Sequence, residues 1–315
     1  MKPSSLLEAA RYYAAHKLHD IPEMTVPEVV KEMLKAKRDE GLSQRYLRDL
    51  ELRMAHFVAD EKFQGQISGV TGPQIKEWLQ NKNVGNCTKN NLRTGLHTLF
   101  MFAKAQKYVP KEWSEFDAVP AWKAKEEEIE IFTPAEMAMV LSAADKQMIP
   151  FLAIGGFAGL RSAEIERLDW SKVNLKTGYI TVDASIAKTN SRRLVPISPN
   201  LNAWLAPHAK KQGPVVAVGT ISHALRRLVQ LINAKLTSKA DTASLPAAHD
   251  GEGKKAFAWK HNALRHSFCS YRMAFVKSAA EVALEAGNTP KMIFRHYREL
   301  VTEDDAKAWF AIEPK

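Results

Sequence analysis

Hydrophobic residues recur at helical spacing through the first hundred residues of the chain. Residues typical of helix N-caps stand before four of these apolar stretches and predict four helix starts. The caps are Thr25 with Glu28, Ser43, Thr71 with Gln74, and Thr88. A short helix is also expected over residues 1–20, where its abrupt start suggests a preceding segment. We therefore expect an all-helical domain over residues 1–107.

Helical periodicity breaks over residues 108–131, where two prolines and two tryptophans interrupt it. The charged run KAKEEEIEIF begins directly after the second tryptophan, Trp122. This composition is typical of an interdomain linker. Such a linker either lets two domains close around opposite sides of a duplex or serves as an ordinary connector.

A second domain is expected over residues 132–315. It opens with the capping box of Thr133 and Glu136, and the strongly apolar helix MIPFLAIGGFAGL follows. Between Trp170 and Ser198 the pattern changes to a period of two, which predicts three strands, VNL, YITVDAS and RRLVPIS. The expected fold is therefore mainly α with a small antiparallel β meander, an α+β class.

Four helices are expected near the C-terminus, after a polar, Gly- and Ala-rich segment that predicts a flexible loop over residues 238–255. In the first of these helices, apolar residues recur at helical spacing, and cap residues mark the others. The marker residues are Leu264, Phe268 and Tyr271; Ser278, Glu281 and Gly287; Thr289 and Pro290; and Thr302. The last helix carries Trp309 and Phe310, which stay exposed unless another surface covers them.

The charge balance points toward a polyanionic partner. The 315 residues include 45 Lys and Arg against 35 Asp and Glu, a net charge of +10. Cys87 and Cys269 are the only cysteines, so we expect free thiols in a reducing compartment. No CxxC or HExxH motif indicates a metal site, and neither a membrane-spanning run nor a signal peptide is found. The expected location is therefore the cytoplasm.

Two arginines, a lysine and a tyrosine suit chemistry on a phosphodiester. Arg161 begins a helix beside three glycines, where it either binds phosphate or pairs locally with Glu164. Arg265 and Tyr297 lie at the two ends of a helical unit, so a guanidinium could hold the phosphate that a phenol attacks. A core or interface position is the other interpretation of the tyrosine. Lys188, on a hairpin turn, either donates a proton or protects a sheet edge.

Basic and polar residues also lie along the helices of the first domain. They are Arg45, Arg48, Lys89, Asn91, Arg93 and Lys104. Such groups suit contacts with DNA phosphates from helix ends and grooves. A solvated basic face is the alternative, and the sequence balances the two evenly.

Four motifs in this order resemble the tyrosine recombinases, the phage integrase family. They are GLRSAEI, AKTNSRRLVPI, NALRHSF and AGNTPKMIFRHY. The resemblance covers the chain from Thr133 to the C-terminus closely, and residues 22–107 loosely resemble the helical core-binding domain of that family. It implies a catalytic domain of the tyrosine-recombinase fold after a DNA-binding domain.

The resemblance also implies roles for individual residues. Arg161 and Arg265 match the arginines that hold the scissile phosphate, and Lys188 matches the general acid. Tyr297 matches the nucleophile that forms a 3′-phosphotyrosyl link. Asn262 and Asn288 stand where the family has histidines, and an amide can hydrogen-bond a phosphate but cannot carry its proton. We expect this to slow the chemistry by roughly 10² to 10⁴-fold without abolishing it.

The function that the resemblance implies is site-specific recombination or integration of DNA by a mobile element. Double-stranded DNA is the expected partner, bound by a homotetramer of chains that are monomers in solution, with accessory DNA-bending proteins, near the nucleoid. No metal, ATP or other cofactor is expected. The tail around Trp309 would either dock into a neighbouring protomer or fold back on its own domain. A DNA-binding protein that has lost catalysis and a type IB topoisomerase-like enzyme are the alternatives.

Overall fold

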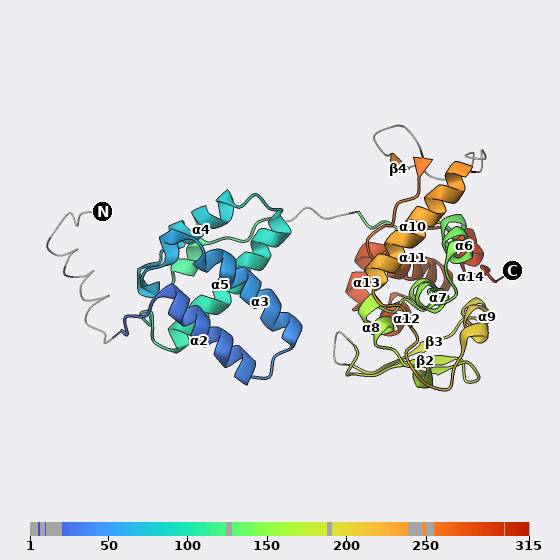
Figure 1. Cartoon of the computed structure of the whole chain (residues 1–315), viewed down its shortest axis with the longest axis horizontal. Helices are drawn as coiled ribbons and strands as arrows, with labels where there is room; N and C mark the ends of the chain where they lie inside the picture. Colours follow the sequence, from blue (N-terminus) through green and yellow to red (C-terminus); the bar gives the residue numbers. More distant parts are fainter. Residues whose placement is uncertain are drawn as a thin grey trace. The chain divides into compact units, whose positions relative to one another are not determined.

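The computed structural model describes residues 6, 10, 21–123, 128–187, 191–238, 248–249, 255–298 and 300–314. Contacts divide the chain into two compact units, Met1–Glu127 and Glu128–Lys315. Figure 1 labels most of their helices and strands. The helix expected over residues 1–20 and the loop expected over residues 238–255 lie mostly outside the described residues.

The first unit is helical. Its elements are α2 (Val26–Asp39), α3 (Gln44–Val58), α4 (Gly72–Asn81) and α5 (Asn86–Ala105), with the 3₁₀ turns η1 (Glu61–Phe63), η2 (Ile67–Gly69) and η3 (Glu115–Ala118). The predicted caps Thr25, Ser43 and Thr71 are confirmed at the starts of α2, α3 and α4. The start predicted at Thr88 is wrong by two residues, because α5 begins at Asn86 after Gly85.

The segment expected to be a linker is largely part of the first unit. Val109, Phe116 and Val119 are buried in its core. Trp113 stacks on Phe100 with ring centroids 4.6 Å apart. The prolines in this segment end the helical periodicity, but the apolar residues between them still bury against α4 and α5. The boundaries expected at residues 107 and 132 are therefore corrected: residues 109–122 pack with the first unit.

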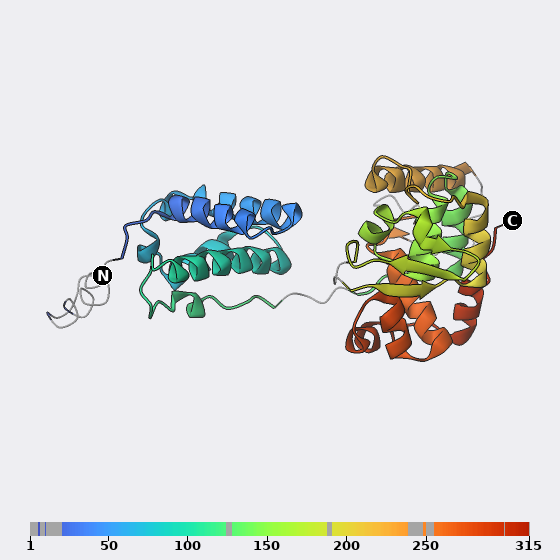
Figure 2. The same cartoon turned by 90° about the horizontal axis from the view of Figure 1, so that it is seen from below.

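The second unit surrounds one apolar helix. Its helices are α6 (Pro134–Ala143), α7 (Ile149–Ala158), α8 (Ser162–Glu166), α9 (Pro199–Leu205), α10 (Ile221–Ser238), α11 (Ala263–Val276), α12 (Ala279–Ala286), α13 (Pro290–Tyr297) and α14 (Glu303–Phe310). Residues 150–158 of α7 are all buried, in contact with α6, α8, α9 and α11. Figure 2 shows α10 on one side of this unit and the α12–α13 pair on the other. Helices α9 and α10 lie in a stretch for which no element was expected.

The predicted β meander is confirmed. Strands β1 (Val173–Asn174), β2 (Tyr179–Val182) and β3 (Arg193–Pro196) form an antiparallel sheet in that order. In its register Ile180 pairs with Val195, and both side chains are buried against the unit. The 3₁₀ turn η4 (Trp170–Lys172) leads into β1. A second strand pair joins β4 (Ala248–His249) and β5 (Lys255–Ala256). The turn η5 (Ala206–His208) extends α9.

The C-terminal tail folds back on its own unit. Trp309 of α14 is fully buried and stacks on Tyr271, with ring centroids 4.4 Å apart. Its indole Nε1 donates a hydrogen bond to the carbonyl of Gly156 at 3.0 Å. The indole of Trp204 donates to the carbonyl of Ile312 at 2.9 Å. Of the two positions expected for this tail, the structure has the intramolecular one.

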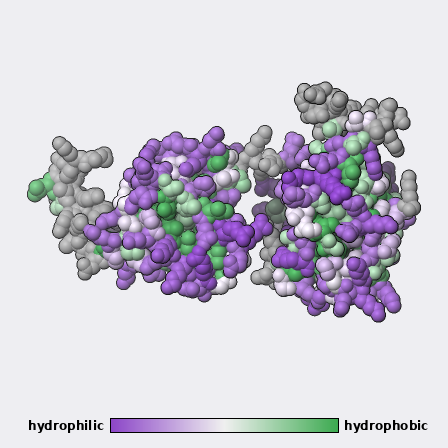
Figure 3. Space-filling view, in the orientation of Figure 1, coloured by the Kyte–Doolittle hydropathy of each residue, from purple (hydrophilic) through white to green (hydrophobic). Residues whose placement is uncertain are grey.

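Hydrophilic residues cover most of the surface seen in Figure 3, and the hydrophobic residues visible there form small patches. Among the described residues, no helix is long and apolar enough to cross a membrane.

Candidate active site

A sharp chain reversal after α7 positions the first candidate arginine. Gly159 ends α7 with φ +66°, a left-handed conformation that glycine adopts without strain. A Cβ at this position would lie 2.1 Å from Cδ1 of Phe268, so no larger residue fits. The chain then enters α8 with Arg161 as its N-cap residue. Local geometry thus aims the Arg161 side chain across the unit toward α12 and α13.

The guanidinium of Arg161 joins α8 to the loop before α13. Its Nη2 donates to the carbonyl of Gly287 at 2.7 Å and to Oδ1 of Asn288 at 3.3 Å. Its Nη1 donates to Oε1 of Glu164 at 3.0 Å. Two candidate residues predicted from separate motifs, Arg161 and Asn288, are therefore in direct contact. The local ion pair with Glu164 is also present, so the two interpretations of Arg161 coexist.

Glu164 connects this arginine to the β sheet. Arg193 on β3 donates from Nη2 to Oε2 of Glu164 at 2.6 Å and from Nε to the carbonyl of Glu285 at 3.0 Å. Burial alone would raise the pKa of Glu164, but hydrogen bonds from Arg193 and the Arg161 backbone, with both positive charges, lower the pKa to about 2. Sequence reasoning missed Arg193, although RRLVPIS places it on the strand beside the hairpin turn.

Replacing Glu164 by Gln is expected to destabilise the second unit by about 3 kcal/mol, because the half-buried Arg161 and the largely buried Arg193 lose the counter-charge of a buried carboxylate. The carboxylate stabilises the fold fully above its ordinary pKa of 4.5, and this contribution disappears as the pH falls toward the folded pKa of about 2. Urea unfolding at a series of pH values measures it. The difference between wild type and Glu164→Gln should shrink between pH 5 and 2. Curves that stay parallel would contradict the assigned ion pair.

Arg265 on α11 is a half-buried cation, and one of its guanidinium nitrogens has no hydrogen-bond partner among the described residues. Its Nη1 donates to the carbonyl of Gly159 at 2.6 Å. Its Nη2 is buried, and no described residue accepts a hydrogen bond from it. Burial lowers the pKa of Arg265, although a guanidinium remains charged in proteins. A buried donor without an acceptor is costly, so this atom is suited to an anion that the free protein does not contain.

Tyr297 is the last residue of α13, and its side chain is only 6% exposed. Burial, with a smaller effect of Cys269, raises the pKa of Tyr297 to about 12, while the charges of Arg265 and Arg161 partly oppose this shift. Both candidate arginines therefore act on the candidate nucleophile. The hydroxyl lies 2.8 Å from Nδ1 of His266, a hydrogen bond between α11 and α13.

Sequence reasoning missed His266. It follows Arg265 directly in the NALRHSF motif, which was the available signal. The pKa of His266 is lowered to about 4, first by burial and then by the charges of Arg265, His261 and His296. The ring is therefore neutral at physiological pH.

The remaining candidates of the second unit take different positions. Asn262 is exposed and precedes α11 with φ +52°, a left-handed conformation that asparagine tolerates better than most residues. Asn288 follows α12 and contacts Arg161, as described above. Lys188 lies outside the described residues. Within the described part of the chain, no group of three or more His, Cys, Asp or Glu residues could hold a metal ion.

The six candidates of the first unit divide into two groups. Arg45, Arg48 and Asn91 have exposed side chains. The other three are half-buried and donate to backbone carbonyls: Lys89 to Gln80, Arg93 to Val119 and Lys104 to Trp113. In this structure Lys89 joins α5 to the end of α4, whereas Arg93 and Lys104 hold the segment after α5 against that helix. Only part of the set therefore presents free polar groups at the surface.

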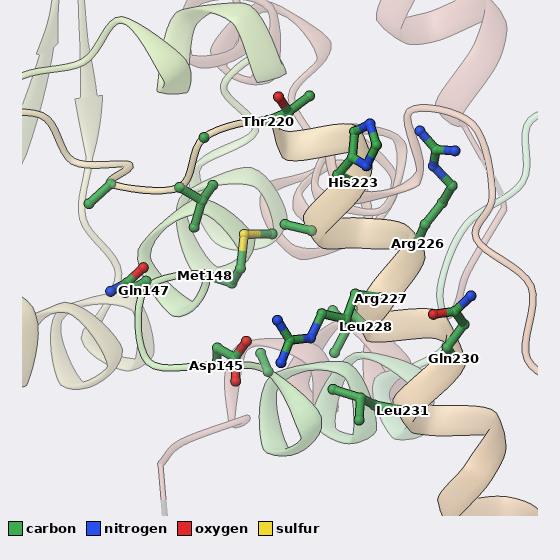
Figure 4. A pocket seen from close by; sticks show the side chains of 15 residues that line it. Asp145, Gln147, Met148, Thr220, His223, Arg226, Arg227, Leu228, Gln230 and Leu231 are labelled. Atoms are coloured by element: carbon green, nitrogen blue, oxygen red, sulfur yellow. The ribbon is translucent and has the colours of Figure 1, made fainter.

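A basic surface on α10 was not expected. A cavity of about 620 Å³ lies between this helix and the loop before α7, and His223, Arg226 and Arg227 are exposed along it (Figure 4). Arg227 points toward Asp145, whereas His223 and Arg226 point away from it (Figure 4). The sequence HALRRLVQLI has the helical spacing that could have revealed this element.

Comparison with known proteins gives the fold a context. Residues 125–276 match the model of the phage integrase family, a range that contains Arg161 and Arg265 and ends before Tyr297. No curated protein matches the sequence.

Solved structures match over most of the chain. The Tn1549 transposon integrase in complex with a circular intermediate DNA is 19% identical, with a TM-score of 0.62 over 90% of this chain and 98% of that one. A lambda integrase dimer bound to a COC′ core site is 14% identical, with a TM-score of 0.66 over 89% and 98%. A lambda integrase tetramer bound to a Holliday junction is 14% identical, with a TM-score of 0.60 over 100% and 83%. At these identities the likeness establishes the fold.

Proposed function

Because residues 125–276 form a domain of the phage integrase family, we propose that this chain is a site-specific DNA recombinase that cuts and rejoins strands through a 3′-phosphotyrosyl intermediate. Tyr297 is the nucleophile, and Arg161 and Arg265 hold the scissile phosphate. The observation that carries the proposal is the buried Nη2 of Arg265, for which the described residues offer no acceptor, while the charge of this arginine acts on the Tyr297 hydroxyl. A phosphate between the two arginines and the tyrosine would satisfy it.

The reaction follows from this arrangement. The phenol oxygen of Tyr297 attacks phosphorus, the bond to the 5′-oxygen breaks, and Lys188 protonates the leaving oxygen. The arginines neutralise the charge that develops on the phosphoryl oxygens, and such preorganised charge supplies much of the lowering of the barrier. The phosphotyrosyl bond conserves the energy of the phosphodiester. A 5′-hydroxyl of another strand can therefore reverse the reaction onto a new partner.

Asn288 and Asn262 take supporting roles in this proposal. Asn288 orients Arg161 through its Oδ1, and the amide nitrogen remains a donor for phosphate. Neither amide can carry a proton, so proton transfer must involve other groups. The two asparagines also favour a second candidate function, that of a DNA-binding protein that has lost catalysis.

Double-stranded DNA is the proposed partner, bound by four copies of the chain during strand exchange. The net charge of +10 and the exposed Arg45, Arg48 and Asn91 support binding to the DNA backbone. The solved relatives include a tetramer on a Holliday junction, which supports the proposed assembly for this chain. Exposed arginines on α10 add a second basic surface.

The experiment that tests the proposal is trapping on a suicide substrate. A nicked duplex that carries the ends of the encoding element loses a short fragment after cleavage, so the covalent adduct accumulates. The expected result is a protein–DNA adduct that survives denaturation and whose modified peptide contains Tyr297. Tight DNA binding with no adduct at any pH from 6 to 9 would overturn catalysis and leave the DNA-binding alternative.

The basic surface of α10 gives a separate prediction. Changing Arg226 and Arg227 together to Ala should weaken DNA binding about tenfold and lower the slope of log K against log salt by about 2, because each phosphate contact contributes roughly one unit. Fluorescence anisotropy across a salt series measures both. The pair Lys210→Ala and Lys211→Ala removes the same charge from another exposed site. Equal slopes for the two double variants would show that α10 makes no specific phosphate contacts.

A further inference from the structure

His266 contacts the reacting atom of the proposed nucleophile. Its Nδ1 lies 2.8 Å from Oη of Tyr297, and the two rings are tilted by 32° with centroids 5.8 Å apart. The contact joins residues 31 positions apart, from the first turn of α11 to the end of α13. Tyr297 is buried and His266 is half-buried, so little water reaches this contact. This geometry meets the requirement that a base lie within hydrogen-bond reach of the proton it removes.

From this contact we infer that His266 is the general base that removes the Tyr297 proton during cleavage and returns it during rejoining, an inference that rests on the proposed function. The need for a base follows from the phenol's surroundings. Because burial raises the pKa of Tyr297 to about 12, only roughly one molecule in 10⁵ carries a phenolate at pH 7. Spontaneous ionisation thus supplies very little nucleophile.

The surroundings of His266 keep the ring neutral in the free protein, so the lone pair of one ring nitrogen can face the phenol. The titratable groups that act on it are Arg265 on its own helix, His261 just before that helix, and His296 and Tyr297 on α13. Burial and the positive charges lower the pKa of His266 to about 4, so the ring stays neutral through the physiological range. In the tautomer that carries its proton on Nε2, Nδ1 accepts the phenol hydrogen.

Other candidate bases are less well placed. The amides at Asn262 and Asn288 cannot take a proton. The ring of His296 lies edge-on to that of Tyr297 with centroids 6.5 Å apart, and no described hydrogen bond joins it to the hydroxyl. Asn262 and Asn288 stand where the family has histidines. His266 therefore supplies the imidazole that these two positions lack.

The proton balance closes without an added reactant. In cleavage the Oη–P bond forms, the P–O5′ bond breaks, the phenol proton passes to Nδ1 and the 5′-oxygen takes a proton from Lys188. In rejoining the incoming 5′-hydroxyl gives its proton to the now neutral Lys188 amine, the P–O5′ bond forms, the Oη–P bond breaks and the imidazolium returns its proton to the phenolate. The imidazolium exists only while the phosphotyrosyl bond exists, beside the negative charge of the bound phosphate.

The test compares pH profiles of single-turnover adduct formation for the full chain. Wild type should react at a nearly constant rate from pH 6 to 9, since its base is neutral throughout. His266→Gln keeps an acceptor for the hydroxyl but takes no proton, so it should react about 10²-fold more slowly at pH 7. Its rate should rise about tenfold per pH unit, because it depends on prior ionisation of Tyr297. His296→Gln, the same change at the neighbouring histidine, should keep the flat profile.

A second substrate separates the two proton transfers. When sulfur replaces the bridging 5′-oxygen, the leaving thiolate needs no proton. The defect of His266→Gln should persist on this substrate, whereas that of Lys188→Ala should largely disappear. A purely structural role for His266 would lower the rate without changing its slope against pH.

The outcomes distinguish this inference from the proposed function. If wild type forms no adduct, the proposed function fails and the question of a base does not arise. If wild type forms the adduct and His266→Gln keeps a flat profile, or regains wild-type rate on the sulfur substrate, His266 is not the base. A sloped profile in His296→Gln with a flat one in His266→Gln would assign the role to His296.

Discussion

Tyr297→Phe is expected to lose strand cleavage by a factor of roughly 10⁴ or more while it still binds DNA, because the change removes only the oxygen proposed to attack phosphorus. The phenyl ring can occupy the same buried space among Phe268 and Ile293. The variant loses one hydrogen bond to His266, so its stability should change by about 1 kcal/mol. Adduct formation on the suicide substrate and DNA binding by anisotropy measure the two properties separately.

A second buried tyrosine provides the matched control. Tyr271 lies on α11, is 2% exposed, and donates from its hydroxyl to the carbonyl of Phe132 at 2.9 Å. Tyr271→Phe therefore loses one buried hydrogen bond, as Tyr297→Phe does, but should keep the wild-type cleavage rate. Adduct formation by Tyr297→Phe at the wild-type rate would show that another residue is the nucleophile.

Trp309→Ala is expected to destabilise the second unit by about 4 kcal/mol, the range found when a buried tryptophan or phenylalanine is truncated. The indole is fully buried, stacks on Tyr271 and donates to Gly156. The indole packs directly against the α7 backbone at Gly156. Because glycine has no side chain that could move into the vacated space, the cavity left by alanine stays open on that side. For a domain of this size the loss should lower the melting temperature by about 8 to 16 °C.

Calorimetry of the full chain checks this prediction, because the transition of the second unit should move while that of the first stays in place. Leu284→Ala is the control. Leu284 is 76% exposed on α12, so its truncation should change stability by less than about 0.5 kcal/mol. An unchanged transition in Trp309→Ala would show that α14 does not pack on its own unit in solution, and that the tail has the intermolecular position instead.

Much of the local structure could be predicted because its causes are short-range. A cap such as Thr133 needs only the backbone three residues away and its partner Glu136, and both contacts are present. The period of two between Trp170 and Ser198 likewise predicts strands without knowledge of their neighbours. The extended linker was the main error. Prolines end a helix locally, but whether Val109 and Phe116 are buried depends on α4 and α5, which lie elsewhere in the sequence.

The sequence by itself determined the two-part helical plan, the small β meander and the motif residues Arg161, Arg265 and Tyr297. The tertiary structure decided which of their atoms remain available for chemistry. It left Nη2 of Arg265 buried with no acceptor in the described part of the chain, and it directed the Tyr297 hydroxyl to His266. The reason is physical: burial and hydrogen bonding between side chains on α11 and α13 depend on how those helices pack, and no local pattern of residues specifies that packing.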